Sequence, residues 1–317
     1  MTDWVEVPFE VQKPQDGLRV DAYLAQRLHR YSRSAVQKLI GEGQVLVAGR
    51  AVKASTRVAA GQTVIIRYPR REEPPPAADR LDVVFEDQWL LAVDKPPRML
   101  SHPTDKVVEN SVTTVLKKQL GGAKLHLAHR LDRETSGVLL LAKDPATARL
   151  LTDAFFERAV RKRYLALVAG RLDWTRKTVD APIDYEGGDI MVRQSVGAGQ
   201  PAVTDFEVLA GNDALSLVAA RPRTGRLHQI RVHLASLGAS ILGDKLYTGD
   251  GAYYMKAVRR ELTDADLDAL GAPRQMLHAE RLDIAHPVTD APLSIRAPLP
   301  PDFRAALSAA GLEAPDA

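Results

Sequence analysis

Short apolar stretches with interspersed polar residues recur along most of the chain. Typical runs are TVIIRY (63–68), AVTDFEVL (202–209) and LSLVAAR (215–221). Residues 81–96 contain two further runs separated by four residues, as in a hairpin, and Pro96 and Pro97 end the second run. Short strands of this kind with only a few helices between them predict an α+β fold with a mixed, largely antiparallel sheet, and not a doubly wound parallel one.

The amino-terminal region has a pattern of its own. Residues 17–28 place apolar side chains at helical spacing, and Ser32 or Ser34 can cap a second helix. The segment GQVLVAGRAV (43–52) predicts a tight hairpin around Ala48 and Gly49. Two helices followed by short strands therefore predict a small separate module.

Most of the positive charge lies in that module. Residues 17–71 hold eleven Lys or Arg and two acidic residues, a net charge of +9, so the rest of the chain carries −6 of a total of +3. A basic module neutralises phosphates and releases their condensed counterions, which makes nucleic acid the expected partner. Three consecutive prolines then predict a linker over residues 71–80. The predicted domains are 17–70 and 81–304.

The densest cluster of charge lies in LAHRLDRETSGVLLLAKD, residues 127–144. His129, Arg130, Asp132, Arg133 and Glu134 directly precede an apolar strand. Charge beside a segment that must be buried suggests an active site. Because a lone Asp in a turn is usually a cap or a solvated charge, this interpretation depends on further motifs.

Three further motifs follow in order: KRYLALVAG (162–170), RPRTGRLHQIRVHLASLGASILGDKLY (221–247) and MLHAERLDIAHPVT (276–289). With residues 127–144, they resemble the RluA family of RNA pseudouridine synthases over roughly residues 81–300. The resemblance implies a pseudouridine synthase catalytic domain that isomerises uridine in RNA without an organic cofactor. The amino-terminal pattern resembles the S4-like RNA-binding module that many members carry.

The resemblance also implies roles for single residues. Asp132 is expected to be the catalytic carboxylate, Tyr164 to contact the target base and assist deprotonation, and Arg231 to pair with Asp132. Leu277 is expected to line the site, and Arg130 to insert into the space left by the base when it is flipped out of the RNA.

For several other polar residues near these motifs, a functional and a structural interpretation both stay open. His129 either supports the same loop or makes a structural hydrogen bond, and Lys162, Arg226 and Arg223 are either phosphate contacts or solvated charges. The residues expected to bind RNA from the amino-terminal module are Arg19, Arg27, Arg30, Arg33, Lys38, Arg50 and Lys53. The helices of that module are expected to leave Arg19, Arg27 and Arg30 facing solvent.

A helix is expected within the third motif. Its apolar face is formed by Leu227, Ile230, Leu234 and Leu237. Arg231 lies off that face, so it can reach into a cleft. We hypothesise that it keeps Asp132 ionised, because an opposite charge within a few ångström lowers a carboxyl pKa by about 1 to 3 units.

Composition excludes several kinds of chemistry. The chain has no cysteine, so disulfides, thiolate metal sites and cysteine nucleophiles are excluded. The eight histidines lack the spacing of metal ligands, and we expect no metal. No apolar run approaches the roughly 18 residues needed to span a bilayer, so we expect no membrane partner and a cytoplasmic location. A monomer is the default expectation.

Three alternatives remain open. The chain could be a non-catalytic RNA-binding protein whose second domain is a degenerate scaffold. It could be an unrelated hydrolase with His129 and Asp132 as acid and base, although no Ser elbow or metal set accompanies them. Within the family, the substrate could be tRNA. We prefer large-subunit ribosomal RNA, because the tRNA-modifying members often lack the basic module.

Overall fold

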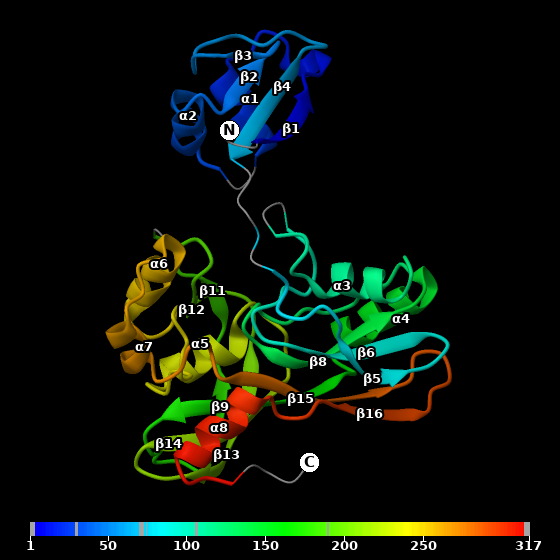
Figure 1. Cartoon of the computed structure of the whole chain (residues 1–317), viewed down its shortest axis with the longest axis vertical. Coiled ribbons are helices and arrows are strands. Elements are labelled where there is room, and N and C mark those ends of the chain that lie inside the picture. Colours follow the sequence, from blue (N-terminus) through cyan, green and yellow to red (C-terminus); the bar gives the residue numbers. More distant parts are fainter. Residues whose placement is uncertain are drawn as a thin grey trace. The chain divides into compact units, whose positions relative to one another are not determined.

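The structure, a computed structural model, describes residues 4–28, 31–69, 73, 75–104, 107–188 and 190–313. It divides into two compact units, Met1–Glu72 and Glu73–Ala317 (Figure 1). The division lies within residues 71–80, where the sequence predicts a linker, and residues 71, 72 and 74 of that segment lie outside the described part.

The amino-terminal unit is a small sheet with two helices. Its elements are β1 (Trp4–Glu10), a 3-10 turn (Lys13–Gln15), α1 (Val20–Arg27), α2 (Arg33–Gly41), β2 (Val45–Val47), β3 (Arg50–Ala51) and β4 (Thr63–Pro69). The strands form an antiparallel sheet in the order β1-β4-β2-β3. Ser32 caps α2 by accepting a hydrogen bond from the Ala35 N–H. Ala48 and Gly49, both with positive φ, form the hairpin turn. The predicted helices, hairpin and strand are confirmed.

No prediction covers β1, which contains Pro8. The strand lies at the edge of the sheet and pairs only with β4, and an edge strand can accommodate a residue without an N–H group. The core of this unit lies between the sheet and the helices. Its largest buried side chains include Val20, Tyr23, Leu24, Val36, Ile40, Val45, Val64 and Ile66.

The second unit is built on a ten-stranded sheet. The elements that precede its central strand are β5 (Asp82–Glu86), β6 (Leu90–Lys95), α3 (Val112–Gln119), β7 (His126–Leu127), β8 (Ser136–Ala142) and α4 (Pro145–Phe156). Then follow β9 (Arg161–Ala169), β10 (Arg176–Asp180), β11 (Ile183–Tyr185), β12 (Gln194–Val196), β13 (Val203–Gly211), β14 (Leu215–Pro222) and α5 (Gln229–Ser236). The last elements are a 3-10 turn (Gly249–Gly251), α6 (Ala252–Arg259), α7 (Asp264–Leu270), β15 (Leu277–Ala285), β16 (Pro292–Arg296) and α8 (Pro301–Ala309).

The sheet confirms the predicted fold class. Its strand order is β10-β13-β14-β9-β15-β8-β6-β5, with β16 added to β15 and β7 added to β8. Among the described strands, β8 and β15 form the one parallel pair, and all other pairings are antiparallel. The predicted hairpin over residues 81–96 is β5 with β6. The fold is therefore α+β with a mixed, largely antiparallel sheet.

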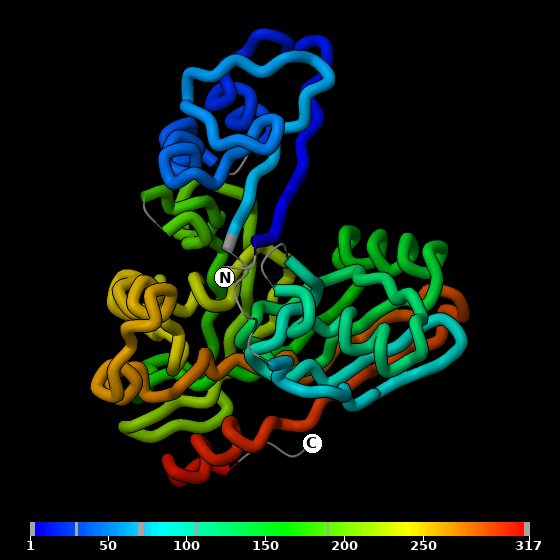
Figure 2. Tube along the Cα trace, turned by 45° about the horizontal axis from the view of Figure 1, so that its top comes forward, coloured from blue at the N-terminus to red at the C-terminus, as the bar shows by residue number. Residues whose placement is uncertain are grey.

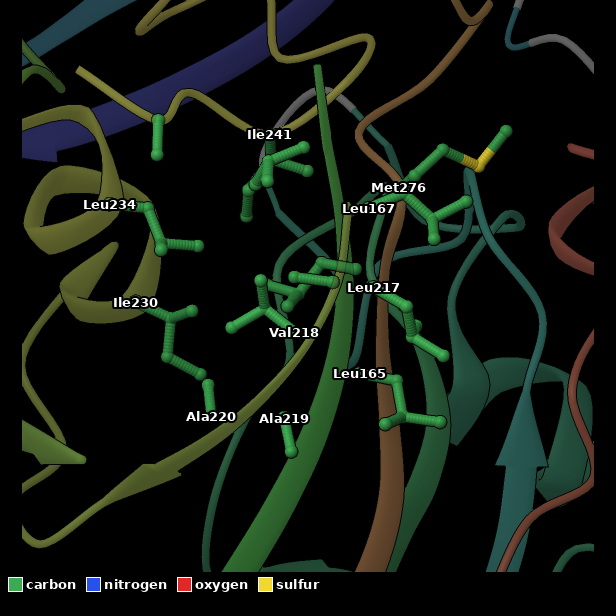
Figure 3. Close-up of a cluster of buried hydrophobic side chains, with 14 of the residues drawn as sticks. Leu165, Leu167, Leu217, Val218, Ala219, Ala220, Ile230, Leu234, Ile241 and Met276 are labelled. Carbon is green, nitrogen blue, oxygen red and sulfur yellow. The ribbon is translucent and has the colours of Figure 1, made fainter. Parts of the chain in front are cut away.

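Helices cover both faces of this sheet. On β6 and β8, alternate residues belong to two clusters, one packed against Val112, Val115 and Leu116 of α3 and the other against Leu151 of α4. Farther along the sheet, the buried side chains of β9 and β14 pack against Ile230 and Leu234 of α5 (Figure 3). The centre of the sheet is therefore buried, and the loops that leave it are held by rigid elements.

Two regions depart from the sequence-based expectations. The predicted boundary at residue 304 falls inside α8, whose Phe303 and Leu307 are buried in the cluster formed by β9 and β14, so the domain continues past it. No prediction covers residues 251–275, which form α6 and α7. Figures 1 and 2 both show this helix pair at the side of the unit opposite the β5–β6 hairpin. No helix in the described part of the chain is long and apolar enough to cross a membrane.

Candidate active site

A cleft of about 1340 Å³ opens at the centre of the sheet. It is lined by the loop between β7 and β8, by β9, by the loop between β14 and α5, and by the end of α4. Its cationic lining residues are Arg130, Arg133, Arg158, Lys162, Arg223, Arg226 and Arg231. Asp132 is the one carboxylate among the described residues that line it. A cleft with this charge suits a polyanion that presents one reacting group to one carboxylate.

The loop that carries Asp132 is fixed on both sides. Ser101 Oγ donates to the carbonyl of Leu131 at 2.9 Å and accepts from its N–H at 3.0 Å. The buried Lys95 ammonium donates to the carbonyls of Pro96 and Met99, both at 2.8 Å, and to that of Arg133 at 3.2 Å. Three carbonyl acceptors match its three N–H groups. Asp132 therefore lies on a loop whose backbone is held immediately before and after it.

Arg231 makes the contact with Asp132 that the sequence predicts. Its Nη1 donates to Asp132 Oδ2 at 2.8 Å, and its Nε and Nη2 donate to the two oxygens of Asp244 at 2.7 and 2.8 Å. Arg231 is 7% exposed, and Asp244 is 1% exposed. A buried guanidinium requires such pairing, and the bidentate contact with Asp244 fixes the direction in which Nη1 points.

The electrostatics of this group keep Asp132 ionised. Burial alone would raise the pKa of Asp132, but the charge of Arg231 and the hydrogen bond that Arg231 donates outweigh burial and lower that pKa. The three charges of Asp132, Arg231 and Asp244 sum to −1. This group of three side chains is therefore formally anionic, whereas the lining of the cleft around it is cationic.

A second series of contacts connects Tyr247 to Asp132 through His228. The Tyr247 hydroxyl accepts from the Gln194 N–H at 3.1 Å and lies 3.2 Å from His228 Nδ1, while His228 Nε2 lies 3.9 Å from Asp132 Oδ2. Burial first, and then the charge of Arg231, lower the pKa of His228 to about 4, so the ring is neutral. If the Tyr247 hydroxyl donates to Nδ1, the His228 proton lies on Nε2 and faces the carboxylate.

Tyr164 and Leu277 also line the cleft, as the resemblance predicts. Tyr164 lies on β9, the central strand, between Ala220 of β14 and Ala279 of β15. Burial, and next the charge of Asp132, raise the pKa of Tyr164 well above its usual value, so its phenol is protonated at neutral pH. Lys162, two residues earlier, donates to the carbonyl of Thr224 at 3.3 Å, and burial lowers its pKa to about 8.

His129 and Arg130 differ in their surroundings. His129 Nε2 accepts from the Leu140 N–H at 3.0 Å, and its ring stacks on Phe155 at a centroid distance of 4.7 Å. Burial first, and then the charge of Lys162, lower the pKa of His129 to about 3. These contacts match the structural reading of His129. Arg130, the next residue, is exposed on the lining of the cleft.

The loop between β14 and α5 contributes the opposite lining. The Gln229 side chain accepts from Thr224 Oγ1 at 2.7 Å and from the Arg226 N–H at 3.0 Å, which fixes this turn. Arg223 is paired with Asp205 at 2.7 Å, and Arg226 donates to a carbonyl at 3.2 Å, that of Pro201. Both side chains still line the cleft.

The predicted helical position of Leu227 is wrong. α5 begins at Gln229, after His228 with a φ of 55°, and Leu227 is 48% exposed on the lining of the cleft. Every residue from Gln229 to Leu234 is buried, so this part of the helix has no solvent face. Periodicity identifies one apolar stripe, but it cannot show that a polar side chain on another face is also buried.

Two of the amino-terminal arginines do not face solvent as isolated charges. Arg19 and Arg33 both pair with the buried Asp21 at 3.1 Å, and Gln37 donates to the same carboxylate at 2.8 Å. Arg19 nevertheless faces solvent as expected, with 43% of its side chain exposed, while its guanidinium is one of the partners that the buried carboxylate requires. Arg27, half-buried, donates to the carbonyl of Glu10 at 3.1 Å.

The other basic residues of this unit have more open surroundings. Lys38, Arg50 and Lys53 are exposed, and Arg30 lies outside the described residues. In the part of the chain that the structure describes, no group of three or more His, Asp or Glu side chains could hold a metal ion.

Comparison with known proteins identifies the family. Residues 89–236 match the family model for RNA pseudouridylate synthase, and residues 18–64 match the S4 domain. The chain is 35% identical over 274 residues to the uncharacterized RNA pseudouridine synthase YjbO of Bacillus subtilis, a match that covers 83% of this chain and 89% of the relative. The chain belongs to the RNA pseudouridine synthases of the RluA type.

Two further relatives agree with this assignment. The ribosomal large subunit pseudouridine synthase C of Vibrio cholerae is 32% identical over 313 residues, which cover 94% of this chain and 95% of the relative. The solved structure of human RNA pseudouridylate synthase domain containing 4 has a TM-score of 0.58 and 30% identity, and it covers 74% of this chain and 95% of its own. This pseudouridine synthase is therefore an isomerase that converts uridine in RNA to pseudouridine, and the readings as a non-catalytic binding protein and as a hydrolase are wrong.

Several residues that hold this site have no role in the sequence-based expectations. Asp244, Tyr247 and His228 all stand inside the third motif, and Lys95 ends the predicted hairpin. The one signal in the sequence is that polar residues occur within stretches that are otherwise apolar. That signal marks them as needing partners, but it does not say which.

Proposed function

We propose that this RNA pseudouridine synthase modifies uridine in large-subunit ribosomal RNA and that Asp132 is its catalytic residue. One observation carries the proposal for Asp132. It is the one carboxylate among the described residues that line a strongly cationic cleft, and Arg231 binds it at 2.8 Å. No other described acidic residue is placed to react with a bound polyanion there.

The reaction sets the requirements for the site. The bond between N1 of uracil and C1′ of ribose breaks, the base rotates, and C5 bonds to C1′. The proton on C5 is lost and N1 gains one, so substrate and product are isomers. The enzyme needs an ionised carboxylate as nucleophile or base, and it needs a pocket that retains the detached base.

Asp132 meets the first requirement, because pairing with Arg231 holds its pKa low. Asp244 binds Nε and Nη2 of Arg231, which leaves Nη1 for Asp132. Arg231 thus acts through Asp132: it orients the carboxylate and keeps it charged before the substrate arrives. A preorganised charge does not have to be rearranged during the reaction.

Tyr164 and Leu277 would hold the base. The protonated Tyr164 phenol presents a ring and a hydroxyl group to the cleft, which suits stacking on the detached uracil and hydrogen bonding to it. Leu277 adds an apolar contact that favours a dry pocket. Arg130, exposed beside Asp132, would fill the space that the flipped base leaves in the RNA, at the cost of a few kcal/mol of unstacking that its contacts offset.

The choice of ribosomal RNA draws support from the relatives and from the amino-terminal unit. A relative that matches 94% of the chain is named a large-subunit ribosomal synthase, and the match to the S4 domain adds a basic module of net charge +9 in residues 17–71. Lys38, Arg50 and Lys53 expose charge there for phosphate contacts. A ribosomal substrate also favours the cytoplasmic location that the sequence suggests.

A tritium-release assay tests both parts. Unmodified large-subunit ribosomal RNA and unmodified tRNA, each transcribed with [5-³H]uridine, would be incubated with the wild type and with Asp132→Asn. We expect release from ribosomal RNA by the wild type and a loss of roughly 10³-fold or more in the variant, because the carboxylate reacts with or deprotonates the substrate. Mapping the product would identify the uridine.

Glu207→Gln is the matched control, because it also changes a carboxylate to an amide. Glu207 forms surface ion pairs with Arg176 and Arg221, whose side chains are 80% and 45% exposed. Such pairs contribute little, so its activity should equal that of the wild type. Full activity of Asp132→Asn would contradict the role of Asp132. Release from tRNA alone would overturn the ribosomal substrate and leave the role of Asp132 intact.

A further inference from the structure

Two consecutive phenylalanines at the end of α4 have opposite surroundings. Phe155 is turned inward and stacks on His129, in the loop that carries Asp132. Phe156 is 88% exposed, the highest exposure among the large apolar side chains of the described residues. Both line the cleft. A scattered surface Leu or Val needs no explanation, but a nearly fully exposed Phe on the wall of an active-site cleft does.

The end of α4 holds Phe156 in a defined place. Arg158 has a φ of 60°, its N–H donates to the carbonyl of Phe155 at 3.3 Å, and the Ala159 N–H donates to that of Ala154 at 2.9 Å. This pair of bonds is a Schellman motif, which ends a helix at a fixed residue. Val160, just beyond it, is buried and anchors the chain to the sheet. Phe156 therefore stands on a rigid support.

The surroundings of Phe156 favour a nucleobase as its partner. Its neighbour Arg158 and Arg226, on the β14–α5 loop, line the same cleft. Among the described residues, neither forms an ion pair with a carboxylate, and Arg226 donates to the carbonyl of Pro201. Leu227, on the β14–α5 loop, adds a second exposed apolar side chain to the lining. An isolated ring among cations suits an RNA base with its phosphates, whereas a protein partner needs a wider apolar surface.

We propose that Phe156 is a stacking platform for an unpaired base of the substrate RNA, next to the uridine that enters the site, with Arg158 binding the adjoining phosphate. Flipping a uridine leaves its neighbours without a stacking partner, and a rigid aromatic ring can replace it. The inference depends on RNA as the substrate, but not on the choice between ribosomal RNA and tRNA.

Steady-state kinetics test this role, with the RNA from which the wild type releases tritium as the substrate. We expect Phe156→Ala to raise KM by roughly 5- to 100-fold, the range that loss of one stacked base gives, with kcat changed by less than about 3-fold. Phe156→Trp should keep KM close to the wild type, because a larger ring stacks as well. Leu150→Ala is the matched control, since Leu150 is 45% exposed on the same helix and does not line the cleft.

Photocrosslinking gives a readout that does not depend on turnover. Irradiation of the full-length protein with the same labelled transcripts should crosslink RNA to the tryptic peptide LLTDAFFER, residues 150–158, and Phe156→Ala should abolish the adduct. A crosslink without tritium release would support the platform while the proposed substrate fails. Equal KM for Phe156→Ala and the wild type, or an equal loss in Phe156→Trp, would overturn the stacking role.

Two measurements separate RNA stacking from packing within the fold and from self-association. Because Phe156 is so exposed, the melting temperature of Phe156→Ala should equal that of the wild type, and a clear drop would mean that the ring packs within the fold. Sedimentation should show the same mass for both proteins. A wild-type dimer that dissociates on Phe156→Ala would overturn the proposal and assign this face to a second copy of the chain.

Discussion

At the scale of single residues, the active site requires that each buried charged side chain has a partner of opposite charge. Arg231 is almost fully surrounded by protein and satisfies two carboxylates, Asp244 and Asp132. Asp244 accepts hydrogen bonds from Nε and Nη2 of Arg231 and holds the guanidinium in place. Nη1 is then free to donate to Asp132. An unpaired charge at this depth would cost several kcal/mol, so the arrangement keeps the Asp132 carboxylate ionised within a stable fold.

The pKa of Asp94 is shifted in the opposite direction to that of Asp132. Asp94 lies on β6 beside Lys95 and directly across the hairpin from Asp82. Burial first, and then the charge of Asp82, raise the pKa of Asp94 to about 6. Because this exceeds the value of about 3.9 in an unfolded chain, the folded state binds the proton more tightly, and stability falls as the pH rises from about 4 to about 6.

Asp94→Asn should therefore stabilise the protein above that window. We expect a gain of about 1 to 2 kcal/mol at pH 8, after allowance for the partial exposure of Asp94, and a smaller gain at pH 5. Urea denaturation at both pH values measures it. Glu207→Gln, at a carboxyl whose pKa is lowered, should show no such gain. A stability difference that does not change with pH would contradict the shift.

At the scale of elements, the site depends on how closely β8 approaches β15. These strands form the parallel pair in which Ser136 faces His278 and Gly137 faces Ala279, directly after the Asp132 loop. Gly137 has a φ of 109°, and a Cβ built on it would lie 2.2 Å from the carbonyl oxygen of Ala279. Only a glycine allows the two backbones this contact.

Gly137→Ala should separate the two strands. We expect a loss of about 3 kcal/mol or more in the free energy of unfolding, because the clash is with backbone and cannot be relieved by rotating a side chain. Activity per folded molecule should also fall, since the Asp132 loop moves with β8. The measurements are urea denaturation and tritium release.

Gly170→Ala is the control for this prediction. Gly170 has a φ of 76° with nothing within 4 Å of an added Cβ, so it tests backbone strain without a clash. Its cost should be about 1 kcal/mol, with activity retained. If both variants lost the same stability, close approach of β8 and β15 would not be the cause.

At the scale of the whole second unit, α8 supports the loop that carries Asp132 through one arginine. Arg274 is 1% exposed and pairs with Asp302 at the start of α8, with contacts of 2.6 and 2.9 Å. Its Nη1 donates to the carbonyl of Glu134 at 3.1 Å, two residues after Asp132. α8 is thereby linked to the Asp132 loop, although 170 residues separate Asp302 from Asp132 in the sequence.

Asp302→Asn should weaken the ion pair with Arg274 and, through Arg274, the hydrogen bond to the carbonyl of Glu134. We expect a loss of about 1 to 3 kcal/mol, below the full cost of breaking a buried pair because the Asp302 side chain is partly exposed. The rate of tritium release should fall as the Asp132 loop loosens. Asp213→Asn, in an ion pair with Arg171 that is exposed on both sides, should change neither quantity. Unaltered stability and rate in Asp302→Asn would contradict the link.

Features that depend on neighbouring residues could be predicted from the amino-acid sequence. Asp144 followed by Pro145 marks the start of α4, and Ala48 with Gly49 marks the hairpin, because caps and turns are local. Alternation identified the strands and the fold class. The motifs identified the family, and the structure brings Asp132, Tyr164, Arg231 and Leu277, the residues that the motifs single out, into one cleft.

The pairing of distant residues became visible only in the folded chain. Asp132 and Arg231 are 99 residues apart, and nothing local shows that Asp244 and Lys95 hold the same site from two other segments. Nor could a periodic pattern show that Leu227 is exposed or that Gly137 faces a backbone carbonyl. Buried charges and close strand contacts are satisfied across the fold, so their partners become known only once the sheet has assembled.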